Sequence, residues 1–132
     1  GGNKTVLAGI PESLPALVKA YRIQDKVANV GFDWEKREDV WAKVKEEIAE
    51  FEVEVDHMDE AKATEEMGDL IFALVNAARL YNIRPDNALE KTNAKFIKRF
   101  NYIEQKAKEK GQSLNDMTLD EMEALWQEAK KA

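Results

Sequence analysis

The sparing use of proline and glycine is the feature that most constrains the fold of this chain. Only 3 prolines and 6 glycines occur in 132 residues, so long stretches can form uninterrupted elements. Within these stretches apolar residues recur at the three- and four-residue intervals of an amphipathic helix. We see no strand-like alternation of apolar and polar residues. The sequence therefore predicts an all-α fold.

Helix start and stop signals divide the chain into about five helices. Residues 1–12 lack a clear periodicity and are expected to be a flexible lead-in. Pro15 suits the opening turn of the first helix, and Thr118-Leu119-Asp120-Glu121 matches a capping box at the start of the last. Short links between amphipathic helices favour an antiparallel bundle within one domain, residues 13–132. The expected helices run from near Ser13 to Gly31, about 37–56, about 59–81, 85–110, and from Thr118 onward.

Charge and composition exclude several classes of partner. The net charge of -6 disfavours binding to nucleic acids and anionic membranes. No apolar run approaches the roughly 20 residues that span a bilayer. The absence of cysteine fits a reducing compartment, and we expect the cytoplasm. The chain begins without methionine, which indicates a processed or tag-derived start, or a fragment of a longer protein.

Two groups of acidic residues are the most informative feature for function. Glu46-Glu47-x-x-Glu50 lies on the second expected helix, and Glu66-x-x-Asp69 lies on the third. Positions three apart share one helix face, so Glu47 points with Glu50, and Glu66 points with Asp69. Both pairs flank the apolar stripe of their helix. We therefore expect the four carboxylates to converge where the two helices meet.

Carboxylates gathered at the margin of a core repel one another unless something offsets their charge. Ligand sets that contain oxygen without histidine or sulfur suit hard cations, chiefly Mg²⁺ or Mn²⁺. A di-iron bundle would need Glu-x-x-His motifs, which the chain lacks. The alternative interpretation is a solvated acidic face without a metal.

Basic and aromatic residues near these helices have two interpretations each. Lys95 and Arg99 share one face of the fourth helix and suit either phosphate binding or ordinary solvent exposure. Lys43 suits a phosphate ligand or an ion pair with Glu47. Trp126 suits stacking on a nucleobase or packing in a core or interface.

The motifs together resemble those of one known family. The two acidic groups are followed by Asn93-x-Lys95-Phe96-x-x-Arg99-Phe100, and the link Ala28-Asn29-Val30-Gly31-Phe32-Asp33-Trp34 precedes them. This combination closely resembles the MazG-type nucleoside triphosphate pyrophosphohydrolases, from about Leu14 to Gln127. Many members carry two such modules in tandem, and the aromatic link resembles the second, catalytically competent one.

The resemblance implies a homodimeric, all-α enzyme with Mg²⁺ at the carboxylates. By motif, the metal ligands are Glu47, Glu50, Glu66 and Asp69. Lys95 and Arg99 would contact the triphosphate, Trp126 would lie near the nucleotide, and Lys43 is a further substrate-binding candidate.

The expected reaction is hydrolysis of nucleoside triphosphates to the monophosphate and pyrophosphate, which would serve nucleotide-pool housekeeping. Either Glu46 or Glu47 would act as the catalytic base, and the sequence does not decide which phosphorus is attacked. One alternative is a related enzyme of narrow specificity, for dUTP, dCTP or phosphoribosyl-ATP. Another is a non-catalytic helical module whose acidic face binds a basic partner.

Overall fold

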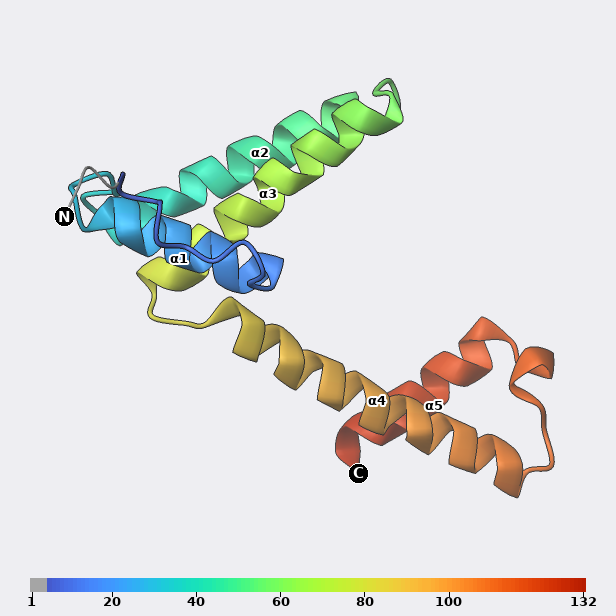
Figure 1. Cartoon of the computed structure of the whole chain (residues 1–132). Helices are drawn as coiled ribbons and strands as arrows, with labels where there is room; N and C mark the ends of the chain where they lie inside the picture. Colours follow the sequence, from blue (N-terminus) through green and yellow to red (C-terminus); the bar gives the residue numbers. More distant parts are fainter. Residues whose placement is uncertain (1–4) are drawn as a thin grey trace. The chain divides into compact units, whose positions relative to one another are not determined.

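The computed structural model describes residues 5–132 of the chain, which contain five α-helices and no strand (Figure 1). The prediction of an all-α fold is confirmed. Residues 1–4 of the expected lead-in lie outside the described residues. None of the described helices is both long and apolar enough to span a membrane. The α-helices are α1 (Ala16–Ala28), α2 (Val40–Glu54), α3 (Glu60–Leu80), α4 (Pro85–Glu109) and α5 (Leu119–Lys131), with short 3-10 turns at Arg37–Asp39 and Leu114–Asp116.

The predicted boundaries need corrections of up to three residues, since α2 begins at Val40 rather than near residue 37 and α1 ends at Ala28 rather than at Gly31. Helix α1 begins at Ala16 rather than near Ser13, and Pro15 precedes the first turn with an extended backbone (φ -55°, ψ 144°). The proline ring disfavours helical geometry at the preceding residue, Leu14, so the helix does not extend back to Ser13 or Leu14. The capping box is confirmed, because the Glu121 N–H donates to Thr118 Oγ1 at 3.1 Å and the Thr118 N–H donates to Glu121 Oε1 at 3.2 Å.

The described residues form two compact units, which divide between Asp86 and Asn87. In the first unit, α2 and α3 lie side by side as an antiparallel hairpin, and α1 packs against α3 (Figure 1). Val40 and Val44, one turn apart on α2, pack against Ala73 and Ala77, one turn apart on α3. The small alanine side chains let the two helices approach closely, which fixes the register of the hairpin.

The second unit has its own core. Ile103 and Ala107 of α4 pack with Met117 and Leu125, and Phe100, Leu114, Met122 and Trp126 surround this cluster. The arrangement of the two units as a single domain over residues 13–132 stays a prediction.

Candidate functional site

Three carboxylates converge on the α2–α3 hairpin, one turn beyond its apolar core. One carboxylate oxygen from each of Glu47, Glu66 and Asp69 lies within 4.8 Å of the other two. Their positions follow from the packing of the hairpin, since Glu47 continues the Val40–Val44 face of α2 and Asp69 continues the Ala73–Ala77 face of α3. We call these three residues the carboxylate cluster.

The cluster combines burial with partial charge compensation. Glu47 is 7% exposed, and Lys43 Nζ lies 3.0 Å from its Oε1. On α3, Lys62 Nζ lies 3.6 Å from Glu66 Oε1. The hydrogen bond to Glu47, together with the nearby Glu46 charge, raises the pKa of Lys43. Burying a carboxylate is costly unless it is paired, so the two lysines reduce the cost of gathering three acidic groups.

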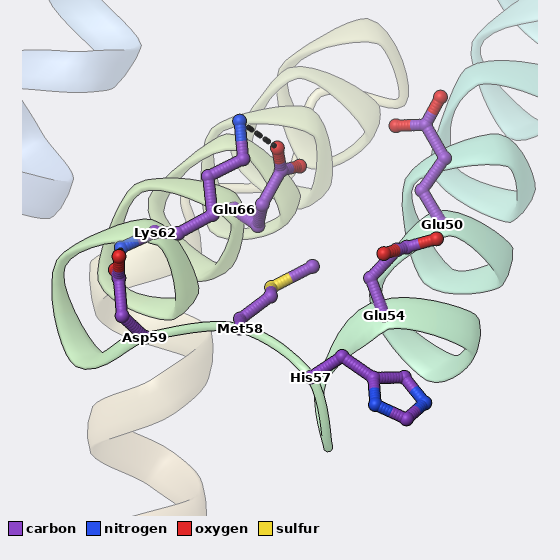
Figure 2. A pocket seen from close by; sticks show the side chains of 7 residues that line it. All are labelled: Glu50, Glu54, His57, Met58, Asp59, Lys62 and Glu66. Atoms are coloured by element: carbon purple, nitrogen blue, oxygen red, sulfur yellow. Dashed lines mark hydrogen bonds and ion pairs between the residues drawn. The ribbon is translucent and has the colours of Figure 1, made fainter.

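The fourth predicted metal ligand, Glu50, lies beside the cluster. It lines a hollow of about 490 Å³ together with Glu66. This hairpin hollow lies where the C-terminal end of α2 meets the N-terminal end of α3, and Figure 2 shows Glu50 and Glu66 on opposite helices. Glu50 is therefore not among the three grouped carboxylates, although it shares the hollow with one of them. The full lining is Glu50, Glu54, His57, Met58, Asp59, Lys62 and Glu66.

Glu46, a predicted catalytic base, is placed differently from Glu47. Its side chain is 56% exposed, and it lies 3.8 Å from Lys43 Nζ. Glu46 is not part of the carboxylate cluster. Lys43 thus contacts both candidate bases, at unequal distances.

The remaining predicted substrate-binding residues lie in the unit of residues 87–132. The Arg99 guanidinium lies 5.5 Å from the centre of the Trp126 ring, and the Phe96 ring lies 5.1 Å from it. The structure therefore brings Arg99 and Trp126 together, next to exposed Phe96. Lys95 is exposed on the same helix.

Comparison with known proteins assigns the family. A model described as the MazG nucleotide pyrophosphohydrolase domain matches residues 35–103, more than half of the chain. The chain belongs to the MazG family. The match includes the carboxylate cluster, Glu50, Lys95 and Arg99.

Curated MazG relatives support this assignment. The chain is 44% identical to a nucleoside triphosphate pyrophosphohydrolase of Escherichia coli K12 over 129 residues, which are 96% of this chain and 49% of the relative. It is 37% identical over 117 residues to a Thermotoga maritima nucleoside triphosphate pyrophosphohydrolase/pyrophosphatase MazG, covering 89% of this chain and 45% of the relative. The chain thus spans about half the length of these two proteins. It is also 54% identical over 78 residues to the uncharacterized protein YabN of Bacillus subtilis, covering 59% of this chain and 16% of YabN.

The donor chemistry of this MazG cluster fits a hard divalent cation. Its ligand atoms are all carboxylate oxygens. Octahedral Mg²⁺, with bonds of about 2.1 Å, places its ligand oxygens roughly 3 to 4.2 Å apart. Oxygens that lie within 4.8 Å of one another need only small side-chain rotations to reach this spacing. The cluster can therefore hold such an ion.

Several residues with contacts in the first unit were missed by the sequence analysis. Lys62 precedes Glu66 by four residues on α3, a spacing that could have identified the ion pair. Met58 and Glu54 carry no motif signal, because their role in lining the hairpin hollow depends on how α2 and α3 are joined. Arg79 was also missed, and it joins α3 to the aromatic link through Asp33, with Nη2 2.6 Å from Oδ1.

Proposed function

We propose that this chain hydrolyses nucleoside triphosphates to the monophosphate and pyrophosphate, with Mg²⁺ bound by Glu47, Glu50, Glu66 and Asp69. The observation that carries the proposal is the approach of three carboxylates from two helices to within 4.8 Å. Membership of the MazG family and the names of the relatives support the same reaction. Mn²⁺ should substitute for Mg²⁺, because it accepts the same oxygen ligands.

In the proposed mechanism, the metal ion, the catalytic base and the phosphate-binding residues have separate roles. Bound Mg²⁺ would neutralise phosphate charge and lower the pKa of a coordinated water. Either Glu46 or Glu47 accepts a proton from the attacking water. Lys95 and Arg99 stabilise the negative charge that develops on the leaving pyrophosphate. The planar guanidinium of arginine suits contacts with phosphate oxygens.

Two further residues complete this assignment. Lys43, whose Nζ lies 3.0 Å from Glu47 Oε1, would be a further ligand of a phosphate oxygen. Trp126 holds the Arg99 guanidinium against its ring and lies near the nucleotide. In this scheme the attacked phosphorus, α or β, stays open.

Product analysis of matched variants tests the proposed reaction. Phosphorus NMR of wild-type protein with ATP and Mg²⁺ should show AMP and pyrophosphate in equal amounts. Asp69→Asn and Glu66→Gln should abolish turnover, whereas Glu65→Gln, an exposed neighbour outside the cluster, should leave it intact. Orthophosphate as the first product would instead indicate a phosphatase. A panel of dUTP, dCTP and phosphoribosyl-ATP separates a broad enzyme from one of narrow specificity.

EDTA provides a separate test of the metal. It should stop turnover by wild-type protein, and added Mg²⁺ or Mn²⁺ should restore it. Turnover that persists in excess EDTA would contradict the metal-dependent mechanism.

We also propose that the chain acts as a homodimer in the cytoplasm. Met67, Ile71 and Leu74 recur along one side of α3 and are each about two-fifths exposed in the structure. Binding of a second copy would bury this apolar stripe. Burial of apolar surface is the main driving force for protein association. Light scattering should give twice the mass of 15.1 kDa, and Ile71→Glu should give the monomer mass. A monomeric wild-type protein at micromolar concentration would refute the dimer.

A further inference from the structure

The hairpin hollow extends from the carboxylate cluster toward the turn that joins α2 to α3. Glu66 belongs to both the cluster and the lining of the hollow. Figure 2 shows the Met58 side chain reaching between the two helices, with Glu54 on the α2 side and Lys62 on the α3 side. At about 490 Å³ the hollow falls within the size range of small-molecule sites. A nucleotide bound at the cluster can therefore place one of its two ends in this space.

The charges of the lining indicate which end that is. Four carboxylates, one ammonium and the imidazole of His57 line the hollow. The single ammonium, Lys62 Nζ, pairs with Glu66, and Asp59 Oδ1 already accepts the Lys62 backbone N–H at 2.7 Å. The lining therefore carries more carboxylates than basic side chains, and its field is unfavourable to anions away from a bound metal ion. A phosphate chain would be repelled there, whereas an uncharged group with O–H or N–H donors would be accepted.

Two lining residues match the chemistry of a nucleoside. Figure 2 marks no hydrogen bond or ion pair for Glu54 among the lining side chains, so its carboxylate is available to accept from a sugar hydroxyl or a base N–H. The Met58 thioether offers a polarisable apolar surface of the kind that packs well against aromatic rings.

We propose that the hairpin hollow binds the nucleoside part of the triphosphate, with Glu54 as a hydrogen-bond acceptor and Met58 in contact with the base. This inference rests on the proposed function, and it makes Glu54 and Met58 specificity-determining residues for the reaction. It also assigns a direction to the substrate, with the sugar and base toward the α2–α3 turn and the leaving pyrophosphate away from it.

Steady-state kinetics of Glu54→Ala test the inference by the sign of the effect. Loss of a hydrogen bond to a charged acceptor should raise KM for ATP by about tenfold or more, with little change in kcat. If Glu54 were only a nearby negative charge, its removal would lower KM, because the substrate is an anion. Glu52→Ala, an exposed residue of the same helix outside the lining, is the matched control and should leave KM unchanged. An unchanged or lower KM in Glu54→Ala overturns the inference.

Further substrates distinguish the parts of the site. The penalty of Glu54→Ala should disappear with dATP if the 2′-hydroxyl is the donor, and it should persist with dATP but differ between ATP and UTP if the base is the donor. Met58→Ala should raise KM for every base. Inhibition by inorganic pyrophosphate should be unchanged in both variants, and a weakened pyrophosphate inhibition would place the phosphate end in the hollow instead. Wild-type protein without turnover on any triphosphate would refute the proposed function itself, a result separate from unchanged kinetics in Glu54→Ala.

Discussion

The ion pair between Asp33 and Arg79 allows a quantitative prediction about stability. Arg79 Nη2 lies 2.6 Å from Asp33 Oδ1, and Nη1 lies 3.3 Å from Oδ2, so the contact is bidentate. The Arg79 side chain is only 9% exposed, and Asp33 is 26% exposed. Asp33→Asn keeps the size of the side chain but removes the charge that faces a nearly buried guanidinium. We therefore expect this single change to destabilise the first unit.

The loss of stability in Asp33→Asn depends on the hydrogen bonds that Arg79 keeps. Breaking a fully buried pair costs about 3 to 5 kcal/mol, and a hydrogen bond to a charged group contributes about 1.5 to 3 kcal/mol. Arg79 still donates to Asn76 Oδ1 from Nε at 3.0 Å and from Nη2 at 2.9 Å, and Asp25 lies 3.9 Å away. Because these partners remain, we expect the free energy of unfolding to fall by about 2 kcal/mol, near the lower end of these ranges. For a chain of this size the melting temperature should fall by roughly 8 °C.

The pH dependence of this loss is fixed by the direction of the Asp33 pKa shift. The hydrogen bond from Arg79 lowers the pKa of Asp33, and the backbone N–H of Trp34 adds to this effect. A lowered pKa stabilises the folded state above the ordinary aspartate pKa, about 3.9, and the stabilisation is lost as the pH falls through the lowered value. The difference between wild type and Asp33→Asn should therefore be full at pH 7 and shrink below about pH 4.

Thermal unfolding followed by circular dichroism at pH 7, 4 and 3 measures both quantities. Asp25→Asn is the matched control, because Asp25 lies 3.9 Å from Arg79 and is 55% exposed, so its loss should change the melting temperature little. Equal melting temperatures for wild type and Asp33→Asn at pH 7 would show that the ion pair with Arg79 does not stabilise the fold. A difference that does not shrink at low pH would show that the charge of Asp33 is not its source.

The remaining predictions concern the core of the second unit, the cap of α5 and the backbone conformation of Gly31. Ile103→Ala, at a position that is 3% exposed, should cost about 2 to 5 kcal/mol, whereas Leu119→Ala, at 78% exposed, should be nearly neutral; urea unfolding measures both. Thr118→Ala removes the capping box of α5 and should cost about 1 kcal/mol in the same assay, and an unchanged midpoint would contradict the role of the cap. Gly31→Ala should lower the melting temperature, because Gly31 has a φ of 96° that a side chain disfavours; an equal or higher value would contradict this.

Local sequence patterns predicted the helices well, because helix formation depends on spacing within one segment. The apolar intervals, the capping box at Thr118 and the paired spacing of Glu47 with Glu50 and of Glu66 with Asp69 are all local signals. The start of α1 was misplaced because the effect of Pro15 on the residue before it outweighed the apolar pattern.

Contacts between distant segments could not be predicted from spacing. The pair of Arg79 with Asp33 joins residues 46 positions apart. The different surroundings of Glu47, in the cluster, and Glu50, on the hollow, depend on the register in which α2 packs against α3. The hairpin hollow itself arises from the turn between these helices, and no single residue in that turn has a motif that marks it.

Metal binding by the carboxylate cluster can be measured through Mn²⁺ binding followed by electron paramagnetic resonance. Free Mn²⁺ gives a strong signal that weakens on binding, so the affinity is measured without turnover. Asp69→Asn should bind Mn²⁺ at least about tenfold more weakly than wild type, while Glu65→Gln should bind it equally. Equal Mn²⁺ affinity in wild type and Asp69→Asn would contradict the assignment of the cluster as the metal site.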